Sequence, residues 1–481
     1  MSGLFSALNS SANALEAFQR ALTVVQNNVV NSSTPGYAAQ SLNLDAQPFQ
    51  PGAGLPGGVS AGEIQSSRNE YAEQSVQQQF SALGTLEQKA QNLSDLELNF
   101  NVSSDSGIPG ALNNFFSDVS SWSVTPNDAS ARQAVLDSAQ QVVQAFQQTS
   151  ANLAQTTNNT NTQLQQNLTQ INDLTSQLQT YNQQRLSGDT NDAGLDAQIH
   201  STLEQLSEYV GFTSRTETNG SVTVLMGGQT PLVIGANQYG LKLSFSTPAG
   251  SPATVAGGVP PARILDANGN DVTSMISQGQ LAGLLDVRNN VLPSLSGGAY
   301  QQGSINQLAQ GFADRVNQIL TSGNISDGPP PVPGIPLFTY TAGSPTSVAH
   351  TLSINSSMTP DQLAASDPGP PPVSNGIALR IATLASPTNA ADEINGVSYA
   401  EFYGNIAAQV GRDSGDAQNQ LTVQQQVVAQ ARTLRSQSSG VSLDAEAAKM
   451  IEFQRAYDAA ARMVNVLDTM TQDTINMIPL T

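Results

Sequence analysis

Residues 443–478, LDAEAAKMIEFQRAYDAAARMVNVLDTMTQDTINMI, carry a regular pattern of apolar side chains. Apolar positions recur there in alternating steps of three and four, the period of a helix that packs along another helix. This inner stripe consists of Met450, Phe453, Tyr457, Ala460, Val464, Leu467, Thr471, Thr474 and Ile478. A second, outer stripe beside it consists of Met463, Val466, Met470 and Met477. A helix with two apolar stripes requires neighbours on both sides.

The other end of the chain repeats the pattern. The apolar seam there consists of Leu4, Leu8, Leu15, Phe18, Leu22, Val25 and Val29, with Ser11 at the missing step. Thr34-Pro35-Gly36 ends the helix, because proline donates no hydrogen bond and glycine accepts a positive φ. Each seam alone fits a core helix of a globular domain. Together, at opposite termini, the two helices are expected to pair with each other or with those of neighbouring copies.

Composition excludes several classes of partner. The 481 residues include 17 basic and 37 acidic side chains, a formal net charge of −20, and only three lysines. A nucleic-acid binder needs clustered basic residues, and an anionic membrane surface would repel this chain. We therefore expect no nucleic acid and no membrane among its partners. Charged residues make up only 11% of the chain, which favours a structural or interaction protein with extensive subunit packing.

The chain is poor in the residues of catalytic and metal sites. It has no cysteine and only two histidines, His200 and His350. We expect no catalytic residues, no metal, no cofactor and no enzymatic activity. No apolar run reaches the 18 residues of a membrane span, and the N-terminus does not read as a cleaved Sec signal. The protein is thus expected in the cytoplasm, or to leave by a route that needs no cleaved signal.

The middle of the chain predicts a helical domain with a β insert, so the fold class is α+β and multidomain. Long helices are expected over 71–99 and 128–186, and the segments 279–320 and 396–437 are expected to complete the helical domain. Residues 212–217 and 222–226, on either side of Asn219-Gly220, predict a β-hairpin. The segments 232–234 and 241–245 are expected to extend this hairpin into an antiparallel meander. Residues 38–70 read as an extended connector.

Four local motifs are weighed against simpler structural interpretations. Gly52-Ala53-Gly54-Leu55-Pro56-Gly57 matches the dinucleotide glycine pattern but lacks its strand and helix, so a connector is favoured. Asp266, Asn268, Asn270 and Asp271 resemble the start of a calcium loop, but a tight turn is favoured over a site for Ca²⁺. For His200, with Asp192 and Asp196 upstream, and for His350, surface or capping positions are favoured. Trp122 is expected in the core.

Two terminal signatures resemble a known family. Asn27, Asn28, Asn31, Thr34, Pro35, Gly36 and Tyr37 match the N-terminal signature of bacterial flagellar axial proteins, the rod, hook and hook-associated proteins. Residues 439–444 and 450–462 resemble the C-terminal signature of the hook-associated protein 1 family, which forms the first hook–filament junction. Residues 112–116, 126–135, 279–285 and 308–313 extend the resemblance inward. Flagellin lacks the Thr-Pro-Gly-Tyr signature, and the hook protein lacks this long helical middle.

The resemblance implies a domain organisation around an assembly core. Residues 1–37 with 438–481 would form a terminal helical bundle. Residues 38–209, 279–322 and 392–437 would form the helical domain, 210–278 the outward-facing β domain, and 323–391 Pro-rich loops with a small β element. The expected assembly seam comprises Leu4, Leu8, Leu15, Phe18, Leu22, Val25, Val29, Met450, Phe453, Tyr457, Val464 and Leu467.

The implied function is that of a structural adaptor joining hook to filament in a ring of copies. The implied partners are the hook protein, the second hook–filament junction protein, the type III export apparatus and an export chaperone, and the implied location is the extracellular flagellum. The outer stripe of Met463, Val466, Met470 and Met477 is the candidate chaperone surface, because flexible methionines suit exchangeable partners. Two alternatives remain open: another axial subunit (hook or distal rod), and a secreted adhesin or hydrolase with flagellar-type ends.

Overall fold

The fold is taken from a computed structural model that describes residues 2–50, 55–100, 106–188, 192–248, 250–252 and 254–477. The chain divides into two compact units. Unit 1 comprises Met1–Ser81, Asn172–Tyr239 and Gln425–Thr481, and unit 2 comprises Ala82–Ile171 and Gly240–Gln424. The division falls inside three long helices, so each unit contains part of α2, α4 and α11.

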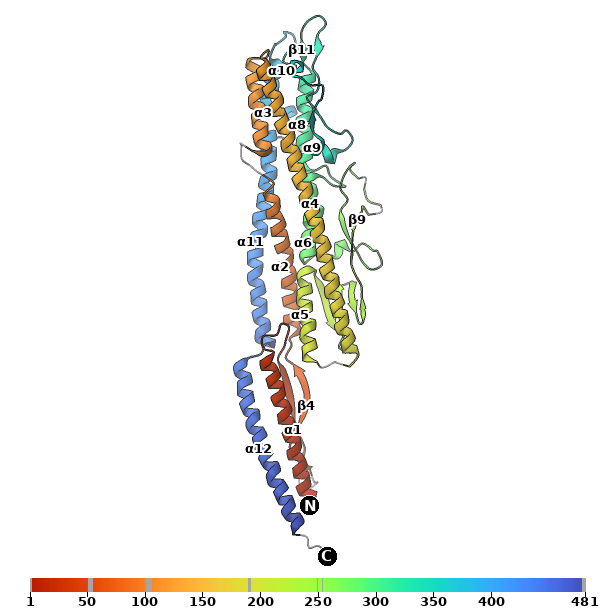
Figure 1. The fold of residues 1–481 in the computed structure, drawn as a ribbon, viewed down its shortest axis with the longest axis vertical. Coiled ribbons are helices and arrows are strands. Elements are labelled where there is room, and N and C mark those ends of the chain that lie inside the picture. The colour runs from red at the N-terminus through yellow and green to blue at the C-terminus, as the bar shows by residue number, and fades with distance from the viewer. Residues whose placement is uncertain are drawn as a thin grey trace. The chain divides into compact units, whose positions relative to one another are not determined.

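Unit 1 contains both terminal helices (Figure 1). Its helices are α1 (Ser2–Val30), the start of α2 (Glu70–Glu97), the end of α4 (Ala129–Leu186), α5 (Ala193–Tyr209), the end of α11 (Tyr399–Ser439) and α12 (Leu443–Asn476). An antiparallel ribbon of β1 (Gln40–Ala46) and β4 (Val59–Ser66) packs against α1. Within that ribbon, β2 (Phe49–Gln50) pairs with β3 (Leu55–Pro56). The connector expected over 38–70 is therefore largely a hairpin.

A four-stranded sheet completes unit 1. It consists of β5 (Phe212–Thr216), β6 (Val222–Met226), β7 (Thr230–Ile234) and β8 (Asn237–Gln238), in that order. The predicted hairpin is confirmed: Phe212 pairs with Met226 and Thr216 with Val222, and Gly220 takes a φ of 82° at the turn. On β6, Val222, Val224 and Met226 are buried and alternate with half-buried positions. This is the period of two that one covered sheet face produces.

Unit 2 has a helical core. Its helices are the remainder of α2, α4 and α11 with α3 (Gly107–Val124), α6 (Gln280–Asp286), α7 (Leu292–Ser296), α8 (Ser304–Thr321), α9 (Val348–Thr351) and α10 (Gly376–Ala382). The long helices expected over 71–99, 128–186 and 396–437 are confirmed. The segment 279–320 is interrupted instead. A π-helical turn (Val287–Val291) joins α6 to α7, and Gly297 and Gly303 have positive φ between α7 and α8.

Unit 2 also contains short strands, which form two-stranded antiparallel pairs. They are β9 (Lys242–Phe245) with β10 (Ala262–Leu265), β11 (Asn324–Ser326) with β12 (Val332–Pro333), and β13 (Phe338–Thr339) with β14 (Ser353–Ile354). Short 3₁₀ turns occur at Thr273–Met275, Pro345–Ser347, Pro360–Gln362, Thr383–Ala385 and Ala390–Asp392. The prediction that 241–245 continues the meander is wrong. This segment pairs with β10, where Leu243 lies opposite the fully buried Ile264.

An aromatic cluster fixes the core of unit 2. The ring of Phe312 on α8 lies 5.5 Å from that of Phe115 on α3 and 5.7 Å from that of Tyr399 at the start of α11. Both contacts are edge-on, the geometry that aromatic quadrupoles favour. Trp122 is fully buried and donates its indole N–H to the carbonyl of Pro126, which confirms the predicted core role.

Candidate assembly interface and its polar base

The inner stripe of α12 faces α1. The two helices pack along one another, and the stripe's described members from Met450 to Thr474 are all half-buried except Thr471, which is buried. Most positions between them are exposed. Ile478 lies outside the described residues. The structure therefore brings Met450, Phe453, Tyr457, Val464 and Leu467 together on the face of α12 next to α1.

On α1 the most deeply buried residues lie partly outside the predicted seam. Leu4, Leu8, Leu15, Phe18, Leu22 and Val29 are half-buried, and Val25 is buried. Ala17 and Ala21 are more buried than the seam leucines, on a helix that packs against α12 and the β1–β4 ribbon. Sequence reasoning missed them because alanine contributes little to a hydrophobic pattern. Small side chains allow close approach of neighbouring backbones at such a point.

The outer stripe of α12 is exposed in the chain alone. Met463 and Val466 are each 58% exposed, Met470 is 51% and Met477 is 75%. Ile451 and Ile475, which the sequence reasoning did not single out, are also more than half exposed. α12 thus covers one apolar stripe against its own chain and leaves the other open.

Asn28 organises the turn that follows α1. It is fully buried, and its side-chain oxygen accepts from the backbone N–H of Gln40 at 2.8 Å and from the hydroxyl of Tyr37 at 2.9 Å. Its Nδ2 donates to the carbonyl of Gln40 at 2.8 Å and to Glu446 Oε2 on α12 at 3.0 Å. Every hydrogen-bonding position of this amide is therefore used, as burial requires.

The remaining signature residues shape the same turn. Asn31 Nδ2 donates to Asn27 Oδ1 at 2.5 Å, and the side-chain oxygen of Asn31 accepts from the hydroxyl of Thr34 at 3.1 Å. Gly36, next to Pro35, takes a φ of 74°, and a Cβ there would lie 2.3 Å from the carbonyl oxygen of Ala197 on α5. The signature thus describes a turn that packs against α5, a partner that the motif alone did not indicate.

Glu446 is a buried charge at the base of α12. Only 3% of the residue is exposed, and its carboxylate accepts from Asn28 and, at 2.8 Å, from Lys449 Nζ one turn later. Burial and the Glu446 charge raise the pKa of Tyr37, which keeps its hydroxyl protonated as a donor. One set of hydrogen bonds therefore links the end of α1, the start of β1 and the first turn of α12.

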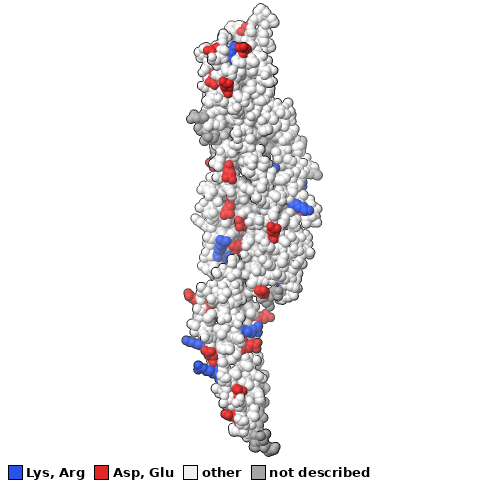
Figure 2. Space-filling view, in the orientation of Figure 1, with Lys and Arg blue, Asp and Glu red and all other residues white. Residues whose placement is uncertain are grey.

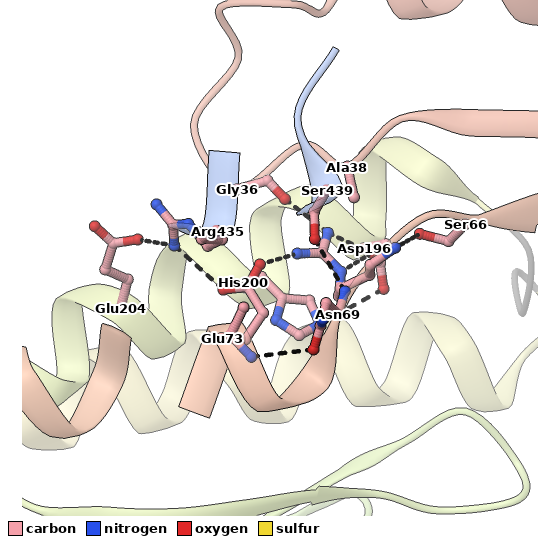
Figure 3. Close-up of polar contacts among 12 residues, drawn as sticks. Gly36, Ala38, Ser66, Asn69, Glu73, Asp196, His200, Glu204, Arg435 and Ser439 are labelled. Atoms are coloured by element: carbon pink, nitrogen blue, oxygen red, sulfur yellow. Dashed lines mark hydrogen bonds and ion pairs between the residues drawn. The ribbon is translucent and has the colours of Figure 1, made fainter. Parts of the chain in front are cut away.

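A network of arginines and carboxylates adjoins this turn (Figure 3). Arg68, just after β4, donates to Asp196 Oδ2 at 2.6 Å, to Glu73 Oε1 at 2.7 Å and to the carbonyl of Gly36 at 2.7 Å. Arg185, at the end of α4, donates to the other oxygen of Asp196 at 2.6 Å. The guanidinium of Arg68 thereby joins α2, α5 and the signature turn.

The network continues to α11. Arg435 contacts Glu73 Oε2 at 3.2 Å and Glu204 Oε2 on α5 at 2.5 Å, while Arg432 donates to Glu204 Oε1 at 2.9 Å. Arg432 also lies over the ring of Phe80 on α2. Backbone groups add two hydrogen bonds at the end of α11. The carbonyl of Ser439 accepts from the backbone N–H of Ala39, and the hydroxyl of Ser439 accepts from the backbone N–H of Asn69. Unit 1 thus has a polar base, defined here as Asn28, Tyr37, Arg68, Glu73, Arg185, Asp196, His200, Glu204, Arg432, Arg435 and Glu446.

Electrostatics fix the charge states of this base. Burial alone raises the pKa of Asp196, but the charge of the Arg68 guanidinium and hydrogen bonds from Arg185 and Arg68 outweigh burial and hold that pKa below its usual range. For Glu204, burial is likewise outweighed by the hydrogen bond and charge of Arg435, so its pKa is also lowered. Both carboxylates therefore stay ionised.

His200 corrects a prediction. It is not a surface or capping residue: its side chain is 13% exposed and lies 3.9 Å from Asp196 Oδ1. Burial, followed by the Arg68 charge, lowers the pKa of His200 to about 3, against a smaller opposing effect of Asp196. The imidazole is therefore neutral. Its helical spacing from Asp196 was visible in the sequence, but the arginines that surround it come from α4, α11 and the segment after β4.

The structure places most of the other motifs that the sequence analysis singled out. Asp266 Oδ1 accepts the backbone N–H of Asn268 and of Asn270, which confirms the predicted tight turn. His350 is exposed, as predicted. Of the glycine pattern, residues 52–54 lie outside the described residues. Across the described ranges, no group of three His, Asp or Glu side chains is arranged to hold a metal ion, and no helix is long and apolar enough to span a membrane.

Comparisons with known proteins give two family matches. The model of the flagellar hook-associated protein FlgK helical domain matches residues 93–338, and the model of the flagellar basal body rod FlgEFG protein C-terminal region matches residues 432–477. The first spans more than half of the chain. The second covers α12 and the end of α11.

Similar proteins point the same way. Flagellar hook-associated protein 1 of Bacillus subtilis is 26% identical over 99% of this chain and 99% of its own length. That of Salmonella typhimurium is also 26% identical, over 67% of this chain and 58% of its own length. In fold, the flagellar hook junction protein FlgK from Burkholderia pseudomallei superposes with a TM-score of 0.61 at 16% identity, over 76% of this chain and 99% of that one. With the helical-domain model matching more than half of its length, this chain belongs to the flagellar hook-associated protein FlgK family.

Proposed function

We propose that this chain is the structural adaptor that joins the flagellar hook to the filament, between the hook protein and the second hook–filament junction protein. One observation carries the proposal. In a chain of the FlgK family, α12 packs one apolar stripe on α1 and leaves a second exposed. A long exposed apolar stripe on a folded chain marks an interaction surface.

Assembly proceeds through the terminal helices. The bundle of 1–37 with 438–481 forms the inner contact of a ring of copies. The helical segments of 38–209, 279–322 and 392–437 form the outer contact. The β segments within 210–278, which belong to two separate sheets, face outward with the Pro-rich 323–391 element. The seam of α1 and α12 supports the packing. Replacing a buried Leu or Phe by Ala typically costs about 2–5 kcal/mol, and every copy in the ring would incur that loss.

Export requires that the outer stripe be covered before assembly. The chain reaches the extracellular flagellum through the type III export apparatus, without a cleaved signal. An export chaperone binds Met463, Val466, Met470 and Met477 and shields them until neighbouring copies replace it. Methionine suits both partners because its unbranched, polarizable side chain adapts to different surfaces.

The alternatives are less well supported. The C-terminal match is to a region named for rod and hook proteins, so α12 by itself fits any axial subunit. The helical-domain match over 93–338 favours a hook-associated protein. A secreted adhesin or hydrolase would need convergent ligand-binding or catalytic groups in the β domain. The proposal is that of a structural protein without enzymatic activity.

Deletion of the gene in the source bacterium tests the proposal. We expect intact hooks without filaments by electron microscopy, and unpolymerised flagellin in the medium. Missing hooks would instead indicate a rod or hook subunit. Normal filaments and motility would contradict a junction role altogether.

A further inference from the structure

A groove of about 650 Å³ runs between α2, α6 and α11 within unit 2. Its floor is apolar, with half-buried Leu86, Ile276 and Val291 around the buried Leu93. Half-buried apolar side chains in a concave surface are suited to a protein partner.

The rim of the groove is acidic. Lys89 and Asp286 pair across it at 2.8 Å and offset one another. Asp413 and Asp416 on α11 also line the groove, and neither has an ion pair within the described part of the chain. Arg412, four residues before Asp416, instead donates to Gln409 at 2.7 Å. Two carboxylates therefore face the groove without a cation.

The chain itself offers a complementary cation. Of its three lysines, Lys89 and Lys449 are in ion pairs, whereas Lys242 on β9 is exposed and has none among the residues described. Phe245, three residues further along the same strand, lies on the opposite face of β9, with the guanidinium of Arg288 5.7 Å from the centre of its ring. Among the described residues, β9 is hydrogen-bonded to β10 and to no other strand. A lone exposed lysine matches an apolar groove with an acidic rim, because its aliphatic stem can lie on the apolar floor while its ammonium group reaches the carboxylates.

The groove and the strand lie on different sides of unit 2. In Figure 1, β9 is on one side of α4, and α11 is on the other side. We therefore expect a contact between them to form between copies and not within one chain. Between copies it is head-to-tail, and contacts of this kind close into a ring when the rotation between copies allows it.

We propose that Lys242 of one copy docks in the groove of the next copy and pairs there with Asp413 and Asp416. This contact rests on the proposed function as a ring of copies and adds a specific surface outside the terminal helices. A chain with a net charge of −20 repels its own copies, and charged side chains are sparse over the surface in Figure 2. Local charge complementarity is then needed to set the register of neighbouring copies.

Cysteine cross-linking in assembled flagella tests the contact directly. Because the chain has no cysteine, any disulfide must come from introduced residues. The double variant Lys242→Cys with Asp416→Cys, expressed in the deletion strain, is expected to give dimers and higher multimers of this chain after mild oxidation, all removed by reductant. The matched control pairs Lys242→Cys with Asp137→Cys, an exposed aspartate of α4 outside the groove, and should remain monomeric.

Charge reversal provides a second measurement if the cysteine variant fails to assemble. Lys242→Glu alone and Asp413→Lys with Asp416→Lys are each expected to reduce the fraction of hooks that carry filaments, and their combination to restore it. Failure of the combination to restore filaments would overturn the contact. The contact would also be overturned if the double cysteine variant assembled into flagella but gave no multimers after oxidation. Cross-linking of the single variant Lys242→Cys would overturn it as well. The unmodified gene, expressed in the same deletion strain, is the control for the proposed function. If it restores filaments while the contact fails these tests, the junction role stands and only the contact is wrong. If the unmodified gene does not restore filaments, the proposed function itself fails.

Discussion

The side-chain amide of Asn28 donates to the buried carboxylate of Glu446 at 3.0 Å, across 418 positions of sequence. This contact sets where α12 begins relative to the end of α1, because Asn28 also holds both backbone groups of Gln40. A buried polar contact between packed helices specifies register more than it adds stability. We therefore expect this contact to contribute to the alignment of the two terminal helices at their base.

Replacement of Asn28 by Ala should loosen this alignment. It leaves the N–H and carbonyl of Gln40 and one oxygen of Glu446 without their partner, and each unsatisfied buried group costs about 1–3 kcal/mol. We expect faster amide hydrogen exchange in α1, β1 and the first turns of α12. The exposed neighbour Asn27→Ala is the control. Unchanged exchange in Asn28→Ala would show that apolar packing alone aligns the helices.

Hydrogen exchange in the unmodified monomer should show a gradient along the same bundle. The ends of α1 and α12 distant from Glu446 lack the polar base and leave the outer stripe uncovered. Isolated helical turns are weak without packing partners. We expect rapid exchange near residues 2–15 and 464–476 and slower exchange near 24–46. Uniformly strong protection to both ends would contradict the idea that these ends order on assembly.

Gly36 allows a paired test of the signature turn. Gly36 and Gly228 both have a φ of 74°, but a Cβ at Gly36 would lie 2.3 Å from the backbone of α5, whereas at Gly228 nothing lies within 4 Å. Both Ala variants incur the cost of a positive φ, about 1 kcal/mol. We expect Gly36→Ala to lower the free energy of unfolding by at least about 2 kcal/mol more, as overpacking typically does. Equal losses in urea titrations would contradict the close approach to α5.

The acid stability of the protein should depend on His200. Its pKa is about 3 when folded, against about 6.5 for an unperturbed histidine. Between these values the unfolded chain binds a proton that the folded chain does not, so stability is lost as the pH falls from about 6.5 toward 3. The slope from this one group is at most about 1.4 kcal/mol per pH unit. Asp196, whose folded pKa is lowered, adds a loss at still lower pH.

His200→Gln removes that proton uptake. We expect its free energy of unfolding to fall less steeply than that of the unmodified chain between pH 6 and pH 4, measured by urea titration at each pH. His350→Gln, at an exposed position, should leave the slope unchanged. Identical slopes for all three proteins would show that folding does not lower the pKa of His200.

Sequence periodicity predicted the helices but not the polar base. Alternating steps of three and four mark α1 and α12, and the Asn219-Gly220 turn marks the first hairpin, because these patterns are local. Arg68, Glu73 and Arg435 show no such period in the sequence. The contacts that tie them to α5 and α11 span 128 to 362 positions of sequence, so no local pattern predicts them. The terminal signature was visible, but its reason, close packing of Gly36 on α5, required the tertiary structure.

The outer stripe makes the most direct functional prediction. Changing Met463, Val466, Met470 and Met477 together to Gln should abolish binding of the export chaperone and attachment of filaments, because each side chain is at least half exposed and contributes little to the chain's own fold. The variant should therefore keep the circular dichroism and thermal unfolding of the unmodified monomer. Leu467→Gln, on the inner stripe, is the contrasting variant and should destabilise the terminal bundle. Normal chaperone binding by the fourfold variant in pull-down assays would remove the stripe as the binding surface. Loss of its folded signal would instead mean that the outer stripe packs within the monomer.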